Sequence, residues 1–160
     1  MEHKKISYAL IAAGALAALG GLFLFFVYAP LIGQEFKQTD PEAAGLYIPM
    51  LGTVWCTGAV YAAAMFFYFR IVWRIGRDES FSASNARDMG RIALCMLIAG
   101  LLLVVLGLLP STLQGISAGS FWIMTVLAAT ASICVGTLAW GISRLLQRAV
   151  SLKEENDLTI

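Results

Sequence analysis

Four long stretches without a charged residue constrain the fold of this 160-residue chain more than any other feature. They cover residues 8–28, 48–69, 92–109 and 120–142, and none contains Asp, Glu, Lys, Arg or His. Because a run of about 20 apolar residues crosses the hydrocarbon core of a bilayer as a helix, each stretch can form one span. The sequence therefore predicts an all-α membrane protein with four transmembrane helices, arranged as a four-helix bundle in a single domain over residues 1–160.

The composition agrees with a protein surrounded by lipid. Hydrophobic residues make up 59% of the chain and charged residues 13%, whereas soluble domains average about half apolar and about a quarter charged. The net charge of +1 gives no general attraction to nucleic acid, so we expect no direct nucleic-acid binding. The first apolar stretch is longer than the core of a signal peptide, which favours an uncleaved first span.

The distribution of Lys and Arg predicts the orientation of the spans. Ten of these residues lie before the first span, in the segment 70–91 between the second and third spans, or in the tail 143–160. The opposite side carries only Lys37. Since Lys and Arg accumulate in cytoplasmic loops, we expect a multi-pass protein of the bacterial inner membrane with both termini in the cytoplasm. Trp73 and Trp140 then fall near the inner interface, where an amphipathic ring is favoured.

Two sequence patterns recur in the two halves of the chain. Residues 30–34 and 110–114 both read P-x-x-x-Q, and residues 70–74 and 144–148 both read R-x-x-x-R. One interpretation is a pair of repeated helical hairpins, and the other is chance. Arginines four residues apart share one helical face, so the second and fourth helices are predicted to continue past the membrane as amphipathic cytoplasmic extensions.

The residues that would support catalysis or transport are missing from the spans. Ionisable groups inside a membrane are costly and usually mark a function, and there are none here. Cys56, Cys95 and Cys134 lack the spacing of a zinc site or a disulfide framework, so we interpret them as small buried hydrophobic residues. We expect no enzyme activity, no cofactor and no metal. Small residues on the first span, such as Gly14 and Ala18, suit close packing within the chain or a homodimer.

The segment 70–91 and the tail are the two candidate cytoplasmic surfaces. Ser82 or Ser84 can cap a new helix, with Phe81 as a hydrophobic staple and Asp88 favoured by the helix dipole. The acidic tail could dock onto the arginines of the loop or remain a frayed, solvated end. Exposed ion pairs contribute only about 0–1 kcal/mol each, so docking would need apolar help.

These two segments resemble those of a known family. The loop 76–85 reads GRDESFSASN and is followed by Arg87 and Arg91, and the chain ends LKEENDLTI. Together with the four spans, they are similar to the bacterial domain-of-unknown-function family 2975. The resemblance implies no established activity. It does imply a context, because such proteins are often encoded beside a small helix-turn-helix DNA-binding protein.

The sequence therefore favours a non-catalytic membrane protein that acts as a partner or sensor for a cytoplasmic DNA-binding regulator. The alternative is a transport-related or immunity-type protein that binds a hydrophobic compound in a cavity lined by Phe23, Phe25, Phe26, Phe66, Phe67 and Trp122. For the leading hypothesis, the residues predicted to bind the partner are Arg74, Arg77, Phe81, Asn85, Arg87, Arg91, Glu154, Glu155, Asn156 and Asp157.

Overall fold

The computed structural model describes residues 2–39, 45, 47–77, 82–108 and 119–157, and the regular elements among them are all helical. The first long helix combines α1, the π-helical turn η1 and α2. The second is α3, the third combines α4 with the π-helical segment η3, and the fourth is α6. Their bounds are α1 Glu2–Phe23, η1 Leu24–Tyr28, α2 Ala29–Thr39, α3 Tyr47–Ile75, α4 Ala83–Leu102, η3 Leu103–Leu108 and α6 Gly119–Asp157.

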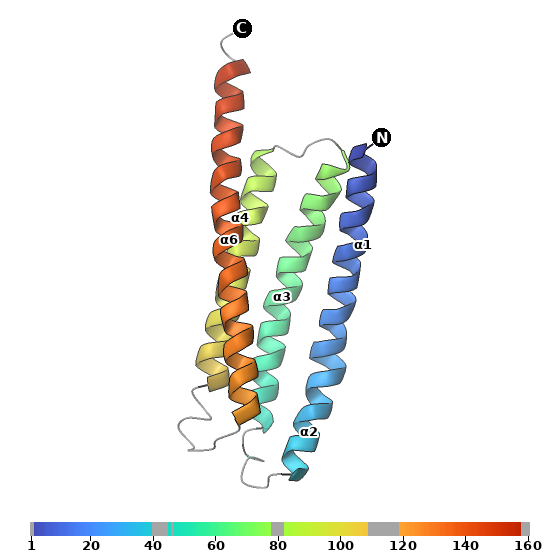
Figure 1. Cartoon of the computed structure of the whole chain (residues 1–160), viewed down its shortest axis with the longest axis vertical. Coiled ribbons are helices and arrows are strands. Elements are labelled where there is room, and N and C mark those ends of the chain that lie inside the picture. Colours follow the sequence, from blue (N-terminus) through green and yellow to red (C-terminus); the bar gives the residue numbers. More distant parts are fainter. Residues whose placement is uncertain (1, 40–44, 46, 78–81, 109–118, 158–160) are drawn as a thin grey trace.

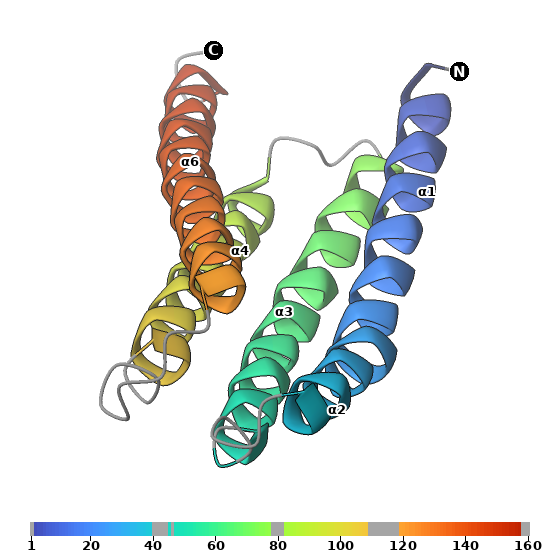
Figure 2. The same cartoon turned by 60° about the horizontal axis from the view of Figure 1, so that its bottom comes forward.

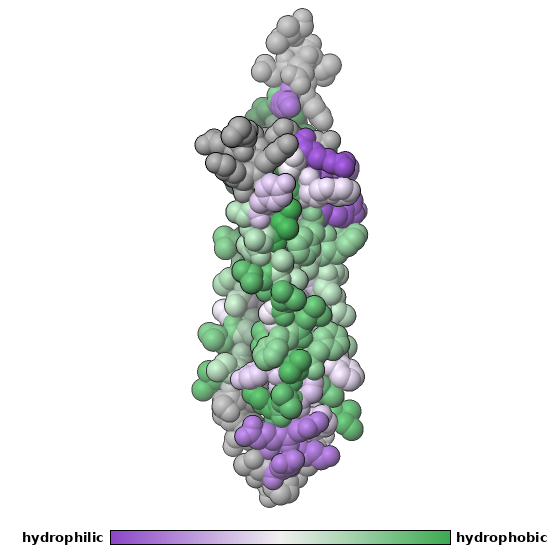
Figure 3. All heavy atoms as spheres, turned by 90° about the vertical axis from the view of Figure 1, so that its right-hand side faces the viewer, coloured by the Kyte–Doolittle hydropathy of each residue, from purple (hydrophilic) through white to green (hydrophobic). Residues whose placement is uncertain are grey.

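Four of these helical stretches are long and apolar enough to cross a membrane: Ser7–Glu35, Tyr47–Ile75, Ala83–Leu108 and Trp122–Lys153. Each contains most of one predicted span. The view of the α1 side shows a hydrophobic band between two polar ends (Figure 3), as expected of a surface that faces lipid. The prediction of an all-α membrane protein with four spans is confirmed, and α3, α4 and α6 continue beyond the apolar stretches as expected.

The helices lie in an open row and do not close into a compact bundle (Figures 1 and 2). The substantial contacts join α1 to α3, α3 to α4, and α4 to α6. The start of α1, the end of α3, the start of α4 and the end of α6 lie at one end of the molecule (Figure 1). We call it the arginine end, because it carries Arg70, Arg74, Arg77, Arg87, Arg91, Arg144 and Arg148.

Glycines explain why α4 and α6 are the most closely packed pair. A Cβ atom on Gly136 would lie 2.9 Å from the Leu97 side chain and 3.2 Å from the Ala93 carbonyl oxygen. A Cβ atom on Gly100 would lie 2.8 Å from Ile133 and 3.2 Å from the Ala129 carbonyl oxygen. Small residues allow such close backbone approach between membrane helices.

The pair α1–α3 uses a different device, in which tyrosines of α3 fill the space beside glycines of α1. The Tyr68 ring lies against Gly14 and the Tyr61 ring against Gly21. Each hydroxyl then donates a hydrogen bond of 2.9 Å to a carbonyl oxygen of α1, at Leu10 and Ala17 respectively. Gly14 and Gly21 thus serve packing within the chain, although the homodimer itself stays a prediction.

Removing these two hydroxyls tests how firmly α1 is held. We expect the Tyr61→Phe/Tyr68→Phe variant to lose about 1–3 kcal/mol of stability, because each hydrogen bond contributes about 0.5–1.5 kcal/mol. The two rings still fill the space beside Gly14 and Gly21, so the fold should persist. Unfolding by dodecyl sulfate in mixed micelles measures the change. Trp55→Phe is a matched control, since Trp55 is 53% exposed, and it should leave the midpoint unchanged.

The two halves of the chain share further features. The π-helical turn η1 ends two residues before Pro30, and η3 ends two residues before Pro110. The Arg70 guanidinium lies 5.8 Å from the Phe66 ring and the Arg144 guanidinium 5.5 Å from the Trp140 ring, both at a spacing of four residues. These parallels agree with repeated hairpins, and the duplication stays a prediction.

The prediction that all three cysteines are buried was wrong. Cys56 and Cys134 are exposed and Cys95 is partly exposed, and all three are free thiols. The reason lies in the helix contacts, whose buried residues are mostly Gly, Ala, Ser and Thr. Cys56 and Cys134 point instead toward the surroundings of the membrane helices.

Candidate functional site

The candidate site begins where α4 starts at the arginine end. Ser82 adopts an extended backbone conformation, and its hydroxyl accepts a hydrogen bond of 3.2 Å from the Asn85 backbone N–H. This is the N-cap arrangement that satisfies an otherwise free amide in the first turn. It confirms Ser82, one of the two predicted candidates, as the cap. The cap fixes the rotation of the first two turns, which carry Asn85 and Asp88.

Asp88 is the centre of the site. Its side chain is 1% exposed, and three guanidinium groups surround its carboxylate. Arg74 Nη1 lies 2.6 Å from Oδ2, and Arg91 Nη1 lies 2.7 Å from Oδ1. Arg70 Nε lies 3.5 Å from Oδ2. A buried charge is tolerated only when it is paired and hydrogen-bonded, and these arginines provide both.

The three arginines differ in how tightly they are held. Arg74 is 19% exposed and also donates a hydrogen bond of 3.2 Å to Asn85 Oδ1. Arg70 and Arg91 are 41% and 51% exposed. Their guanidinium groups lie over aromatic rings of α3, at 5.8 Å for Arg70 and Phe66 and at 5.3 Å for Arg91 and Phe67. Such cation–π contacts further restrict their orientation.

Two serine contacts hold the neighbouring helices at the same end. The Ser143 hydroxyl of α6 donates a hydrogen bond of 2.7 Å to the Ala86 carbonyl oxygen and lies beside Gly90. The Ser7 hydroxyl of α1 donates a hydrogen bond of 3.4 Å to the Val72 carbonyl oxygen. Serine and glycine permit this close approach because neither carries a large side chain. All four helices are therefore joined near the site.

The electrostatic result is a fixed excess of positive charge. Three guanidinium groups surround one carboxylate, so among the described residues the cluster has two more positive than negative charges. Guanidinium groups recognise carboxylates and phosphates, which makes binding of an anionic surface the natural chemistry here. Among the described residues, no group of three His, Cys, Asp or Glu side chains is placed to hold a metal ion.

The predicted partner-binding residues fall into different environments. Arg77 and Arg87 are exposed; the Arg77 guanidinium lies 4.4 Å from the Trp73 ring centroid, and Arg87 donates to the Ser84 hydroxyl. Asn85 is 2% exposed, so it orients Arg74 and offers little surface to a partner. Glu155 is exposed near the end of α6. Residues outside the described part are Phe81 and the side chains of Glu154, Asn156 and Asp157.

The tail continues α6 as a helix to Asp157 and extends past the ends of α3 and α4 (Figure 1). Leu152 and Lys153 are exposed on this extension. At 1.5 Å per residue, the helix rises about 20 Å from Ser143 to Asp157. This part of the tail is therefore neither frayed nor folded back onto the loop, and residues 158–160 lie outside the described part.

Asp88 and Arg70 were not among the predicted site residues, although the sequence contained a signal for them. The spacing of Arg70 and Arg74 gives them one helical face, and Arg91 follows Asp88 by one turn. An acid between two arginine-bearing helices at the membrane surface is a natural counter-charge. The sequence alone does not give the rotation of α4 about its axis, and this rotation turns Asp88 toward Arg70 and Arg74 of α3.

The aromatic residues named for a hydrophobic binding cavity do not gather in one place. Phe25 of η1 packs against Gly58 and Tyr61 of α3. Phe66 and Phe67 meet edge to face at the arginine end, while Phe23 and Phe26 are exposed. Trp122 lies in the first turn of α6, at the opposite end of the molecule, and its indole N–H is buried with no hydrogen-bond partner among the described residues. The described residues thus offer no single cavity for the alternative function.

Comparison with known proteins gives one match. A model of the family described as "Protein of unknown function (DUF2975)" matches residues 31–160. No curated protein and no solved structure matches the chain. The match covers most of the chain, including the Ser82 cap, the Asp88 cluster and the C-terminal extension of α6. The chain therefore belongs to the DUF2975 family of proteins of unknown function, as its sequence motifs predicted.

Proposed function

We propose that this protein is a non-catalytic protein of the bacterial inner membrane that holds a cytoplasmic regulator of the helix-turn-helix type at its arginine end. In this orientation both termini and the α3–α4 connection face the cytoplasm. The excess of Lys and Arg at that end supports the orientation. The regulator is suggested by the genetic context that the family resemblance implies.

The observation that carries the proposal is the bracing of Arg70, Arg74 and Arg91 by the buried Asp88. A flexible arginine loses side-chain entropy when a partner orders it. Arginines already held by a carboxylate and by aromatic rings lose less, so the cluster offers a pre-organised positive surface. Arg77 and Arg87 lie exposed beside it and extend that surface toward the solvent.

The extension of α6 supports the same proposal. It projects past the ends of its neighbours (Figure 1) and carries Lys153, Glu154, Glu155 and Asp157 in its last turns. A charged helix beside a positive surface gives a partner two elements of opposite sign to recognise. Complementary charges of this kind fix the partner's orientation and speed its association.

Co-expression tests the proposal directly. The chain is produced with the helix-turn-helix protein encoded nearest to it in its own genome, and the share of that protein in the membrane fraction is measured. We expect truncation after Leu152 to release the regulator into the soluble fraction. We expect Arg77→Gln/Arg87→Gln to weaken its recovery about tenfold, since each exposed charge contributes about 0–1 kcal/mol.

A charge-matched control separates this surface from the rest of the arginine end. Arg144→Gln/Arg148→Gln removes two charges from the flank of α6 and should leave recovery of the regulator unchanged. Equal recovery by the full chain, the truncated chain and the Arg77→Gln/Arg87→Gln variant would refute the proposal.

A further inference from the structure

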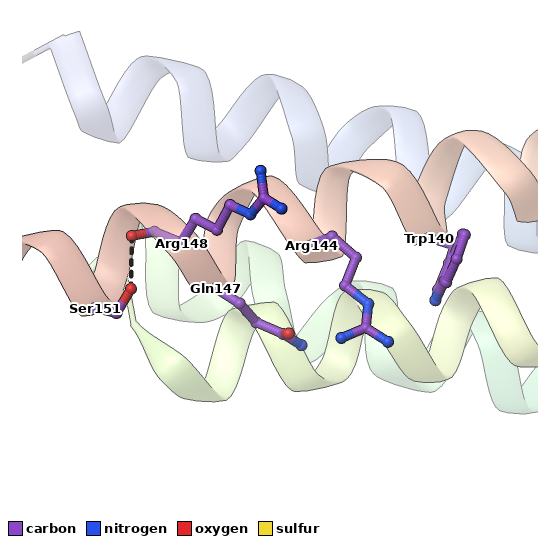
Figure 4. A pocket seen from close by; sticks show the side chains of 5 residues that line it. All are labelled: Trp140, Arg144, Gln147, Arg148 and Ser151. Atoms are coloured by element: carbon purple, nitrogen blue, oxygen red, sulfur yellow. Dashed lines mark hydrogen bonds between the residues drawn. The ribbon is translucent and has the colours of Figure 1, made fainter.

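One flank of α6 carries a hollow that the site around Asp88 does not use. Its volume is about 460 Å³, and side chains from three turns of the helix line it (Figure 4): Trp140, Arg144, Gln147, Arg148 and Ser151. The hollow lies beside the face that α6 packs against α4, where Ser143 is buried. It therefore opens toward the surroundings of the protein at the level of the arginine end.

The charge in this hollow is not balanced by the described part of the chain. Arg70 and Arg74 on α3 share the buried carboxylate of Asp88. Arg144 and Arg148 have the same spacing on α6, but within the described residues no ion pair joins them to an acid. Two arginines on one helical face, one turn apart, repel each other unless an anion comes between them. Within the described residues, both guanidinium groups therefore keep their charge available for an anion.

The position of the hollow along α6 indicates that it lies at the membrane interface. Trp140 is 54% exposed and begins the hollow on the membrane side, where indole rings favour the boundary between headgroups and acyl chains. Arg144 lies one turn further out, with its guanidinium 5.5 Å from the Trp140 ring. From Trp140 to Ser151 the helix rises about 16 Å, which carries the lining from the acyl boundary through the phosphate level.

The available hydrogen-bond donors suit a phosphate diester. Ser151 already donates its hydroxyl to the Arg148 carbonyl oxygen, 2.9 Å away. Within the described part of the chain, the guanidinium groups of Arg144 and Arg148 and the amide of Gln147 are exposed and can act as donors. Guanidinium groups bind phosphate oxygens through paired N–H donors. A zwitterionic headgroup would bring a cation against the same two arginines and is disfavoured.

An apolar track leads away from the hollow into the membrane. Val126, Ile133 and Trp140 follow one another at intervals of seven residues on α6, so they lie close to one line that leads to Gln147. Val126 and Ile133 are 47% and 41% exposed. A lipid whose phosphate sits at the arginines would therefore lay an acyl chain along exposed apolar side chains.

We infer that this flank of α6 is a binding site for an anionic phospholipid, with Arg144, Arg148 and Gln147 around the phosphate and Trp140, Ile133 and Val126 along the acyl chain. The site anchors the fourth helix to the anionic leaflet. It works independently of any regulator bound near Asp88, because it uses side chains of α6 that precede Leu152 and belong to neither the Asp88 cluster nor the charged end of the helix.

Native mass spectrometry of the full chain in detergent tests the inference. The probes are phosphatidylglycerol, phosphatidylcholine and inorganic phosphate. We expect the wild-type protein to bind phosphatidylglycerol in preference to phosphatidylcholine. Arg144→Gln/Arg148→Gln should weaken phosphatidylglycerol binding about 25-fold, because each arginine near an anionic surface contributes about a factor of five. Binding of phosphatidylcholine should stay the same.

Two further variants keep the test independent of folding and of net charge. Gln147→Glu puts an acid between the two arginines, preserves the exposed helical surface and should weaken phosphatidylglycerol binding about fivefold. Arg77→Gln/Arg87→Gln removes as much charge from the same end and should change binding less than twofold. Equal losses in the two double variants, equal affinity for the two lipids, or displacement of the lipid by millimolar inorganic phosphate would each overturn the inference.

Discussion

Replacing Asp88 by asparagine is expected to destabilise the protein by about 3 kcal/mol, which is the lower end of the cost of breaking a buried ion pair. The carboxylate is 1% exposed and serves three guanidinium groups. Asparagine fits the same space but leaves Arg74, the least exposed of the three, without a counter-charge. Arg70 and Arg91 can turn toward solvent, which keeps the expected loss below the maximum.

Double-mutant cycles with Asp88→Asn separate the three pairs. The coupling should be largest for Arg74, at 2.6 Å, smaller for the half-exposed Arg91, and smallest for Arg70, at 3.5 Å. Arg87→Gln is the matched control, because Arg87 is exposed and, within the described residues, donates a hydrogen bond to the Ser84 hydroxyl and not to a buried group. Unfolding midpoints in mixed micelles measure each value. A loss for Asp88→Asn no larger than that for Arg87→Gln would mean that the cluster does not stabilise the fold.

Filling the contact between α4 and α6 is expected to have an effect of similar size. In Gly136→Leu, the new Cβ would lie 2.9 Å from Leu97 and 3.2 Å from the Ala93 backbone oxygen. The leucine side chain can yield, but the backbone cannot without moving the helices apart. Overpacking of this kind costs about 1–3 kcal/mol. Here we expect the upper end, because the two helices meet along their whole shared length.

The matched control lies on the same helix. A Cβ atom on Gly141 meets nothing within 4 Å, so Gly141→Leu should leave the unfolding midpoint unchanged or raise it slightly, since leucine favours helix more than glycine does. Circular dichroism should show equal helix content for both variants at low dodecyl sulfate concentration. Equal midpoints for Gly136→Leu and Gly141→Leu would contradict the close α4–α6 contact.

The spans, the Ser82 cap and the helical extensions could be predicted from sequence because local chemistry determines them. An uncharged run of bilayer length predicts a span, a serine before a helical segment predicts a cap, and arginines four residues apart predict a shared helical face. Each of these patterns lies within one short segment of the chain. Their consequences appear in the bounds of α3, α4 and α6. The side of the membrane follows from the charge distribution in the same way and stays a prediction.

The Asp88 cluster and the open row could not be predicted, since both depend on how helices rotate against one another. Asp88 in sequence is one acid in the second turn of a helix, compatible with a simple dipole effect. Only the packing of α4 on α3 turns it toward Arg70 and Arg74. Likewise, Gly14 suited either a second copy of the chain or a neighbouring helix, and its contact with Tyr68 of α3 depends on how the two helices are turned.

The order of the helices in the row has a consequence for how the protein is made. The substantial contacts join α1 to α3, α3 to α4 and α4 to α6. Each helix after α1 therefore packs against a helix that was synthesised just before it. Assembly can therefore follow synthesis step by step, with short loops to close and no rearrangement of earlier pairs. The Asp88 cluster then forms as soon as α4 is in place, before the last helix is complete.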